Sequence, residues 1–502
     1  MHHRCLPSFS DLSSFLSWLD RNGELTEIRA PVSTFHELTE IHKRVIATEG
    51  PALRLTAPVD GGGRRLAFPV VTNLFGTRQR VAWGLGTDLH GLETLGALLA
   101  WMRSPQVPQS LRQARTMLPA ARSALVARPK IVSPPTSWSD ADVDFSLLPV
   151  QTCWPGDAGP LITWPVVITR PPGADDPSTY NLGIYRMQVL GRDRAIIRWL
   201  PMRGGAMHHR LWQARNLPMP VAVVIGADPA TLIASVMPAP EGVSELALSG
   251  MINNRRVGLA PCKSIMLRAP ASAEIVLEGV VSPTETAQEG PFGDHTGYYN
   301  APEQYPVFSL KRVRVRDGAN YLTTFTGRAP DEPSVLGDAL LDVYKPLLRQ
   351  QIPEIVDVWL PPEACSYRIA VISIAKKYPG QARRVMMGFW SLLPQFSMTK
   401  MVIVVDGDID IRSWADVMWA LATRMDPSRD LMQVDRTPID HLDFASPIDG
   451  LGGKVGFDAT RKIGSETSRE WGKELKMTAQ VEEQVSQRWN EIFVQTTARG
   501  QR

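Results

Sequence analysis

Residues 181–205, NLGIYRMQVLGRDRAIIRWLPMRGG, decide the fold of this chain of 502 residues. The β-branched and aromatic runs predict two antiparallel strands that turn at 191–193, and Gly204 and Gly205 then lead into a helix. Similar short runs, separated by Gly, Asp and Pro, recur from 161 to 315, among them TWPVVIT, VAVVIGA, EIVLEGVV and PVFSLKRVRV. Closely spaced strands of this kind favour a central β-barrel or sandwich with helical inserts.

The segments on both sides of this β-rich region have an α/β pattern. Before it, the strand-like FPVVTNL at 68–74 stands among helical patterns, and a linker rich in Pro and Ser follows. After it, RIAVISIA at 368–375 and KMVIVVDGD at 400–408 enclose a helical segment, which predicts a βαβ unit with parallel strands. We therefore expect a mixed α+β and α/β chain with three domains, at 1–125, 126–325 and 326–502.

Composition and charge exclude several classes of protein. Hydrophobic residues make up 44% of the chain and charged residues 21%, as in ordinary folded domains, which excludes a fibrous or disordered protein. A net charge of +3, from 54 Lys and Arg against 51 Asp and Glu, gives no basis for nucleic-acid binding. The longest aliphatic runs have the length of strands, so no membrane span is expected. The four cysteines lie far apart, which predicts buried free thiols in a reducing cytoplasm.

An apolar stripe near the C-terminus predicts a helix. Its side chains recur at spacings of four, four, three and one, on one helical face: Val481, Val485, Trp489, Ile492 and Phe493. Such a face packs either on its own domain or on another subunit, and the sequence leaves both alternatives open.

The arginines of the opening stretch indicate an anion site. Arg186, Arg198 and Arg203 stand close together in sequence, and the amides of the helix that begins near Gly204 favour negative charge. Guanidinium forks and helix-start amides together can form a cradle for a phosphate, although arginines on a hairpin also commonly face solvent. Asn181 and Arg186 are five apart and point to opposite faces of an ideal strand. They can share one small site only if the strand bends near Gly183, and otherwise they serve opposite ends of a long ligand.

Further along the chain, two carboxylates stand on either side of a short turn. In EGPFGD, the turn 290–293 can bring Glu289 and Asp294 within a few ångström of each other. Like charges at that range raise the pKa of one group, which can then deliver a proton near neutral pH, while an arginine beside them keeps the other ionised. The alternative is an ordinary surface loop, in which His295 is a loop histidine rather than a metal ligand.

Glu245 has a structural and a functional interpretation. It stands in the first turn of a helix that Ser244 is expected to cap, where the helix dipole favours a carboxylate. The alternative is metal ligation together with Asn181, because two protein oxygens and the oxygens of a phosphate suit a hard cation such as Mn²⁺ or Mg²⁺.

Several long motifs resemble those of the UbiD-type decarboxylases and occur in the family's order over nearly the whole chain. They are NLGIYRMQV, IIRWLPMRGGA, GADPAT, PASAEIVLEG, EGPFGDHTGYYN, TGRAPDEP, MDPSRD and HLDFASP. The resemblance implies a central split β-barrel of the flavin-reductase type between α/β domains, and a C-terminal helix that forms oligomers. It also implies a prenylated FMN in the central domain, held through Mn²⁺ and usually K⁺, as the electron sink for loss of CO₂ from an aromatic ring.

The resemblance also carries over to individual residues. Asn181 and Glu245 match the family's manganese ligands. Arg186, Glu289 and Asp294 match its catalytic trio, with Asp294 in the place of the proton donor. The positions that match the flavin-contacting segments are Ile184, Tyr185, Arg186, Arg198, Trp199, Leu200, Arg203 and Gly204. Some relatives bind manganese with a His near position 204, which is Gly here, and neither His208 nor His209 is assigned that role.

The activity implied by the resemblance is decarboxylation of 4-hydroxy-3-polyprenylbenzoate to 2-polyprenylphenol in ubiquinone biosynthesis. The implied partners are a flavin prenyltransferase, which supplies the cofactor, and further copies of the chain in a dimer or hexamer. Because each buried CH₂ contributes ~0.8 kcal/mol, a polyprenyl tail would draw a cytoplasmic enzyme peripherally to the inner face of the cell membrane. The alternatives are reversible decarboxylation of another aromatic or acrylic acid, and a non-catalytic flavin- or lipid-binding subunit. The acidic pair beside Arg186 argues against the non-catalytic alternative.

Overall fold

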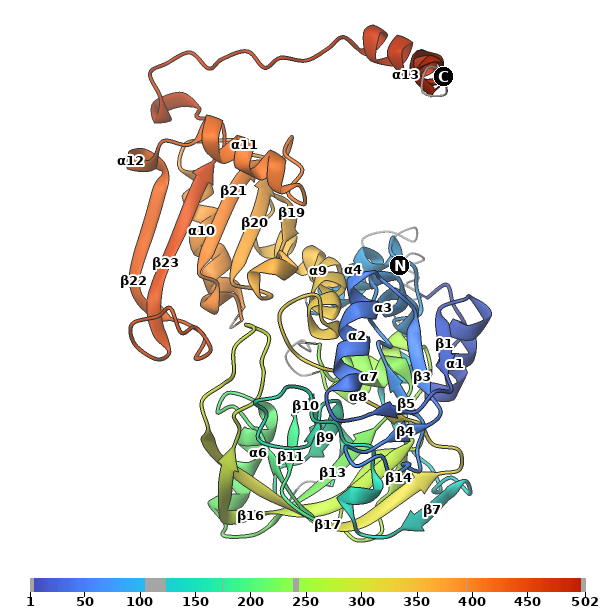
Figure 1. Cartoon of the computed structure of the whole chain (residues 1–502). Helices are drawn as coiled ribbons and strands as arrows, with labels where there is room; N and C mark the ends of the chain where they lie inside the picture. The colour runs from blue at the N-terminus through green and yellow to red at the C-terminus, as the bar shows by residue number, and fades with distance from the viewer. Residues whose placement is uncertain (1–3, 104–122, 174, 238–242, 394, 498–502) are drawn as a thin grey trace.

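A computed structural model describes residues 4–103, 123–173, 175–237, 243–393 and 395–497 (Figure 1). In its N-terminal region, helices pack on a four-stranded sheet with the order β1-β3-β5-β18. The elements of this region are α1 (Leu12–Arg21), β1 (Leu25–Ile28), β2 (Val32–Ser33), α2 (Glu37–Ala47), β3 (Ala52–Leu55), β4 (Pro58–Val59), β5 (Val70–Thr72), α3 (Arg78–Gly84) and α4 (Gly91–Arg103). Strand β5 confirms the strand predicted in FPVVTNL. It pairs in parallel with β18 (Tyr321–Leu322), so the N-terminal sheet includes a strand from the end of the central region.

A nine-stranded sheet forms the central region, with the order β10-β9-β13-β16-β17-β12-β11-β8 and β7 paired to β17. Its strands are β7 (Trp138–Ala141), β8 (Leu161–Ile162), β9 (Pro165–Thr169), β10 (Asn181–Ile184), β11 (Met187–Val189), β12 (Arg194–Ile197), β13 (Met219–Ile225), β16 (Ile275–Glu289) and β17 (Glu303–Arg316). The remaining elements are α6 (Gly204–Gln213), α7 (Pro229–Ala234), α8 (Glu245–Ile252), β6 (Lys130–Ile131), β14 (Gly258–Pro261) and β15 (Arg268–Pro270). Every residue of β13 is buried, as expected for a strand that is covered on both faces.

The central sheet curls into a half-barrel because the chain connects its two ends directly. Strand β10 lies at one end of the strand order and β11 lies near the other, yet only Tyr185 and Arg186 separate them in sequence. Three steps along the chain, from Ile184 to Met187, span at most about 11 Å. The two ends of the sheet therefore meet, which agrees with the first of the two predicted alternatives, a barrel rather than a sandwich with helical inserts. The hairpin of β11 and β12 is antiparallel, as predicted.

Strand β16 is longer than the sequence predicted. The expected strand at 274–281 continues to Glu289, with an irregularity in its pairing with β17 between Val281 and Thr286. The residues after Val281, whose polar sequence indicates a loop, are therefore partly strand, because β17 provides backbone partners that the local pattern does not reveal. Glu289 consequently ends the strand immediately before the turn that leads to Asp294.

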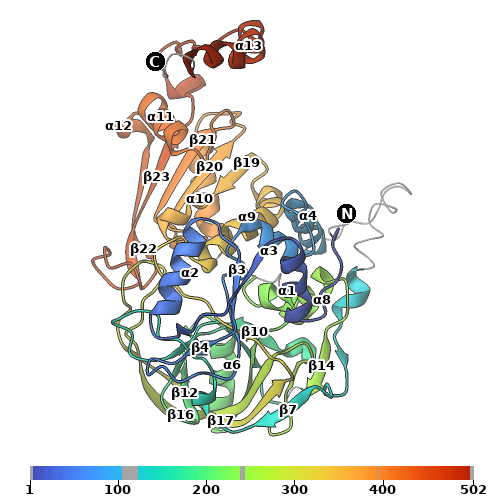
Figure 2. The same cartoon turned by 45° about the vertical axis from the view of Figure 1, so that its right-hand side comes forward.

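Helix α9 (Glu332–Gln351) leads into the C-terminal region, a five-stranded sheet with the order β19-β20-β21-β23-β22 (Figure 2). Its elements are β19 (Ile355–Trp359), β20 (Ile369–Ile374), α10 (Gln381–Leu392), β21 (Met401–Asp406), α11 (Trp414–Arg424), α12 (Pro427–Asp430), β22 (Leu431–Pro438) and β23 (Leu451–Ala459). Strands β20 and β21 are parallel with α10 between them, which confirms the predicted βαβ unit. Ile372 packs with Phe389 of α10, and its neighbour Val371 packs with Val417 of α11, so helices cover both faces of the sheet.

Helix α13 (Ala479–Thr497) confirms the predicted C-terminal helix and lies away from the rest of the chain at the end of an extended segment (Figure 1). Four side chains of its apolar stripe are between 38% and 55% exposed: Val481, Val485, Trp489 and Ile492. The side chain of Phe493 lies outside the described part of the structure. The stripe therefore does not pack on the C-terminal sheet of its own chain.

The four cysteines are not all buried, in contrast to the prediction from the sequence. All four are free, as expected. Cys153 is buried, but Cys5 is exposed and the other two are intermediate, so the prediction of burial was wrong for Cys5. Cys5 precedes the first helix and sits outside the core, which its spacing in the sequence does not reveal. Within the described ranges, no helix is long and apolar enough to cross a membrane.

Candidate active site

Arg186 lies at the centre of a buried cluster of charges. From the connection between β10 and β11, its Nε donates to Glu289 Oε1 at 2.8 Å and its Nη1 donates to Asp294 Oδ2 at 2.9 Å. Glu289 is 0% exposed and Asp294 is 6% exposed. Gln188, two residues after Arg186, accepts a hydrogen bond at 2.9 Å from the amide of Gly290 in the same turn. The structure thus brings together all three residues that match the catalytic trio.

Two further side chains, which the sequence analysis did not assign, hold the turn in place. Asn300 Oδ1 accepts from Arg186 Nη2 and from the amide of Phe292, both at 2.9 Å. Asp157 Oδ1 accepts from the amide of Gly293 at 2.9 Å. Asn300 ends the motif EGPFGDHTGYYN and Asp157 stands in the polar run WPGDAGP, but a sequence does not show which polar side chains are buried.

The electrostatic surroundings hold Asp294 in its ionised form. Burial raises the pKa of Asp294, but the hydrogen bond from His295 and the guanidiniums of Arg186 and Arg198 outweigh it and lower the pKa well below its usual range. The Nδ1 atom of His295 lies 2.9 Å from Asp294 Oδ1, and Arg198 Nη1 lies 3.3 Å from Oδ2. The raised pKa that we expected for one of the pair is therefore not found on Asp294, because His295 and a second arginine act on it in addition to Arg186.

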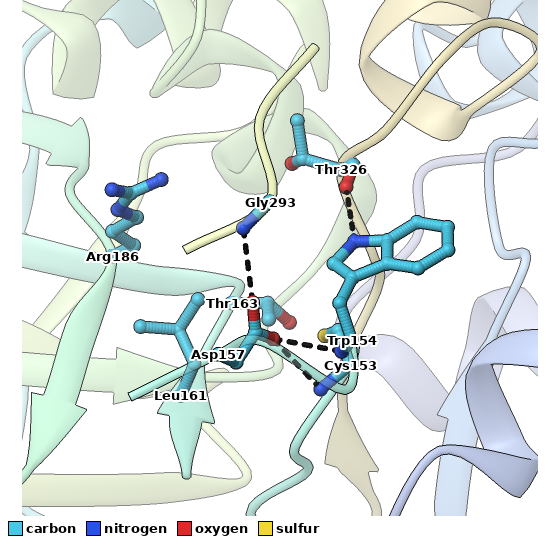
Figure 3. Close-up of a pocket in the computed structure, with 8 residues that line it drawn as sticks. All are labelled: Cys153, Trp154, Asp157, Leu161, Thr163, Arg186, Gly293 and Thr326. Carbon is cyan, nitrogen blue, oxygen red and sulfur yellow. Dashed lines mark hydrogen bonds between the residues drawn. The ribbon is translucent and has the colours of Figure 1, made fainter. Parts of the chain in front are cut away.

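A small cavity of about 30 Å³ opens beside Arg186 (Figure 3). Its wall includes Trp154, Asp157 and Thr163. The carboxylate of Asp157 accepts hydrogen bonds from the amides of Trp154 and Gly293, and burial raises its pKa (Figure 3). This volume suffices for water-sized molecules, so a ligand with several rings requires the larger pocket described next.

A second pocket of about 480 Å³ is lined by Asn181, Gly204 and Glu245, from β10, α6 and α8. Glu245 Oε2 accepts from the amide of Leu182 at 3.3 Å, and burial raises the pKa of its carboxyl group. Ser244 caps α8 as predicted. Because Ser244 provides the cap, the Glu245 carboxylate is not needed for it, and no cationic side chain of the described residues forms an ion pair with this carboxylate.

The first turn of α6 packs directly against Asn181. A Cβ atom at Gly204 would lie 1.9 Å from Asn181 Oδ1. A side chain at position 204 would therefore displace the amide of Asn181. His208 Nδ1 instead lies 2.9 Å from Thr169 Oγ1, and His209 Nε2 lies 3.0 Å from the carbonyl oxygen of Ser282. Among the described residues, no group of three or more His, Cys, Asp or Glu is suited to a metal ion.

Tyr185 lies between the two sites. Its hydroxyl accepts from Asn181 Nδ2 at 3.3 Å and from the amide of Gly205 at 3.4 Å. Its ring makes an edge contact with Trp199, with 6.3 Å between the ring centroids. Arg186 follows directly, so the connection between β10 and β11 carries one side chain that contacts Asn181 of the second pocket and one that belongs to the charge cluster.

The other positions that match the flavin-contacting segments differ in burial. Ile184 is half-buried at the end of β10, and Arg198 joins the charge cluster. Leu200 is 37% exposed, and Arg203 is exposed directly before Gly204 at the start of α6. The structure therefore groups most of the predicted site around β10, β11 and α6, with Leu200 and Arg203 at its surface.

Comparison with known proteins places the chain in a family. Three models described as the N-terminal, Rift-related and C-terminal domains of 3-octaprenyl-4-hydroxybenzoate carboxy-lyase match residues 16–99, 130–329 and 334–459. The fold and the matched domains define a carboxy-lyase, an enzyme that adds or removes CO₂. The chain belongs to the UbiD family of these enzymes.

Solved structures agree with this assignment over most of the chain. The UbiD-class enzyme HmfF from Pelotomaculum thermopropionicum, in complex with FMN, is 29% identical, with a TM-score of 0.75 over 92% of this chain and 97% of that one. Vanillic acid decarboxylase from Sedimentibacter hydroxybenzoicus, in a closed form, is 25% identical, with a TM-score of 0.79 over 97% and 99%. The 3,4-dihydroxybenzoic acid decarboxylase of Enterobacter cloacae shares the fold at 21% identity, with a TM-score of 0.74 over 97% and 100%.

Proposed function

We propose that this UbiD-family enzyme decarboxylates 4-hydroxy-3-polyprenylbenzoate to 2-polyprenylphenol in ubiquinone biosynthesis. The family description, which names a prenylated 4-hydroxybenzoate, supports this substrate. The observation that carries the proposal is the buried contact of Arg186 with Glu289 and Asp294, because binding alone would not need a proton-transfer cluster. The same cluster argues against a non-catalytic binding subunit.

In this proposal the substrate carboxylate lies near Arg186 and Glu289, and Asp294 returns a proton to the ring carbon after CO₂ has left. The guanidinium of Arg186 stays charged and can receive the substrate anion. Glu289 fixes the orientation of Arg186 with contacts at 2.8 and 3.3 Å. Since Asp294 is ionised in this structure, its role as a donor requires that it first receive a proton.

Prenylated FMN, when bound, supplies the electron sink that the loss of CO₂ requires. The matched residues that would hold it are Ile184, Tyr185, Arg186, Arg198, Trp199, Leu200, Arg203 and Gly204. The second pocket fits the phosphate end, because it opens at the start of α6, where backbone amides favour an anion. Relatives solved with FMN and with prenylated FMN support a flavin of this kind.

A divalent cation fits between Asn181 and Glu245. Both side chains line the second pocket, and Glu245 is a half-buried carboxylate without a cationic partner among the described residues. Two protein oxygens leave positions for phosphate oxygens and water, which suits Mn²⁺. We propose Asn181 and Glu245 as its protein ligands and K⁺ as an additional ion of the same phosphate site.

We expect the Gly204→Ala variant to fold but to bind Mn²⁺ and FMN at least about tenfold more weakly, as when the support of a metal ligand is lost. The added methyl group would collide with Asn181 Oδ1 and displace it. Metal analysis and FMN titration of the full chain measure both effects. Gly337→Ala in α9 is the matched control, because its Cβ meets no atom within 4 Å. Equal metal and FMN binding by the two variants would contradict the proposed metal site.

Exposed apolar side chains near the start of α6 support contact with a polyprenyl tail or a membrane surface. Leu200, Met202, Met207 and Leu211 are 37%, 85%, 53% and 49% exposed, respectively. Met207 and Leu211 also line the second pocket. Clusters of this kind commonly mark binding sites. We propose that they bring the enzyme peripherally to the inner face of the cell membrane, where its lipid substrate lies.

Comparison of substrates tests the proposed reaction. The full chain, loaded with prenylated FMN by its prenyltransferase, is assayed for CO₂ release from 4-hydroxy-3-dimethylallylbenzoate, vanillate and 3,4-dihydroxybenzoate. We expect the prenylated acid to have the highest kcat/KM. The second candidate is a decarboxylase of small aromatic acids, which the similarity to vanillic acid decarboxylase favours. A preference for either unprenylated acid would replace the first proposal by the second.

We propose that the stripe of α13 packs on a second copy of the chain in a dimer or hexamer. The stripe is exposed on its own chain, and an evolved form of the related enzyme HmfF is dimeric. We expect Trp489→Asp to lower the mass measured by light scattering towards that of the 55.5 kDa monomer, because it places a charge in the stripe. Gln487→Asp, on the opposite face of α13, is the control. An unchanged mass for Trp489→Asp would exclude the stripe as the interface.

A further inference from the structure

The source of the proton that Asp294 would deliver can be read from its partners, an inference that rests on the proposed function. The side chains that contact the Asp294 carboxylate in the described structure are Arg186, Arg198 and His295. Guanidinium groups do not release protons in proteins. Histidine is the partner whose proton exchanges near neutral pH.

The two oxygens of Asp294 have different partners. Both arginines approach Oδ2, at 2.9 and 3.3 Å. The Nδ1 atom and the backbone amide of His295 both approach Oδ1, at 2.9 and 2.8 Å. The two contacts with one oxygen fix the imidazole ring, so that a proton on Nδ1 points at Oδ1.

The other ring nitrogen faces the C-terminal region. His295 Nε2 lies 3.7 Å from Asp440 Oδ2. Asp440 also accepts a hydrogen bond from the hydroxyl of Tyr367 at 2.8 Å and contacts Arg368 at 3.3 Å. The side chain of His295 is 21% exposed, so water can reach part of the ring, whereas Nε2 itself is buried against Asp440. His295 therefore connects the proposed proton donor with solvent and with a second domain.

The charges around His295 favour its protonated form. Burial lowers the pKa of His295, but Asp294 and Asp440 outweigh both burial and the positive charge of Arg368 and raise it above the ordinary value. Asp331 is a further negative charge that acts on the same ring. The imidazolium can therefore persist at a pH at which an isolated histidine would be neutral.

We propose that His295 resupplies the proton of Asp294 in each cycle and that Asp440 holds the ring in the orientation for this transfer. After Asp294 has given its proton to the ring carbon, the Nδ1–H bond of the imidazolium breaks and an O–H bond forms at Asp294 Oδ1. The imidazole that remains keeps its proton on Nε2 and becomes an imidazolium again when a proton from water is added at Nδ1, so one proton enters for each CO₂ released. A bound substrate carboxylate would favour this transfer, because it partly neutralises Arg186 and so raises the pKa of Asp294. His295 acts through Asp294 and is thus a positioning residue.

The pH dependence of the His295→Asn variant tests the proposal. Asparagine can still donate a hydrogen bond to Asp294 but has no proton to transfer. With the chain loaded with prenylated FMN and 4-hydroxy-3-dimethylallylbenzoate as substrate, we expect kcat to fall about 10²-fold at neutral pH, with KM and flavin content unchanged. In the wild type, kcat should decline as the pH rises through the raised pKa of His295, and this decline should be absent in the variant. Added imidazole should restore part of kcat to His295→Ala.

Two variants make the result specific. His441 lies 2.9 Å from Asp449 through Nδ1, the same kind of contact on an exposed surface, so His441→Asn should leave kcat unchanged. Asp440→Asn should move the decline in kcat to lower pH, because His295 loses one of its two negative neighbours. A kcat of His295→Asn within twofold of the wild type, with the same decline at high pH, would overturn the proposal. If Asp294→Asn were also active, the proposed role of Asp294 itself would be wrong.

A measurement without substrate keeps the test independent of the substrate assignment. In the full chain with labelled histidines, the NMR signal that disappears in His295→Asn identifies His295. We expect it to titrate above the ordinary histidine pKa of about 6.5, and at lower pH in Asp440→Asn. A titration at or below that value, or one unaffected by Asp440→Asn, would overturn the proposed arrangement even if turnover were never observed.

Discussion

The Asp294→Asn variant is expected to lose decarboxylation by a factor of about 10² to 10⁴ while it keeps its flavin. Asparagine has the size of aspartate and can still accept from Arg186, but it cannot deliver an acidic proton. The flavin should remain, because Asp294 lies in the turn after β16 rather than in the second pocket. Steady-state kinetics of CO₂ release, together with the absorbance of the released cofactor, measure both quantities.

Asp449→Asn is the matched control for this variant. Asp449 also contacts a histidine at 2.9 Å, but its side chain is 74% exposed and lies outside the charge cluster. We expect its turnover to equal that of the wild type. Near-normal turnover of Asp294→Asn would remove this residue from the proposed scheme, and loss of flavin from it would show that the turn also supports the cofactor.

The Arg186→Ala variant is expected to be inactive and less stable by about 3–5 kcal/mol, the usual effect of breaking a buried ion pair from one side. Truncation leaves the buried carboxylates of Glu289 and Asp294 without their main partner. Arg198 stays 3.3 Å from Asp294 and 3.9 Å from Glu289, which places the loss at the lower end of that range. Denaturant unfolding of the flavin-free chain measures the change.

The stability difference of Arg186→Ala should depend on pH in a definite direction. In the wild type the pKa of Asp294 is lowered by folding, so its contribution to stability is present above its ordinary pKa and is lost as the pH falls. The variant lacks the part of this contribution that comes from Arg186, so the difference in stability between the two proteins should become smaller as the pH falls. Arg192→Ala, which removes a 73% exposed arginine, should change stability by less than about 0.5 kcal/mol. A similar loss in both variants would contradict the importance of the buried pair.

Much of the fold could be predicted from local patterns. The β11–β12 hairpin, the start of α6, the cap of α8 and the βαβ unit of the C-terminal region follow from turn residues, capping residues and hydrophobic period. The extension of β16 to Glu289 could not be predicted from local patterns, nor could they decide between a barrel and a sandwich, because both depend on pairing with strands that are distant in sequence. The position of α13 away from its domain depends on contacts that a periodic stripe does not specify.

The residues of the site could be predicted from the sequence, but the electrostatic effects that act on them could not. Motif resemblance selected Arg186, Glu289 and Asp294, and the structure brings them into contact. The lowered pKa of Asp294 depends on Arg198 and His295, whose proximity follows from the tertiary fold. For the same reason the contact between His295 and Asp440 could not be foreseen, since the two residues belong to different domains.

The open edge of β10 links the proposed chemistry to the lifetime of the protein in the cell. Strand β10 pairs on one side only, with β9, and helices α6 and α8 contact it. Asn181, Gly204 and Glu245 come from these three separate elements. An ion bound among them would therefore link β10, α6 and α8, which backbone hydrogen bonds do not join. A ligand at 100 times its Kd stabilises the folded state by about 2.7 kcal/mol. Chains without bound cofactor would therefore be less stable and would be degraded first. The supply of flavin would then set the amount of enzyme in the cell.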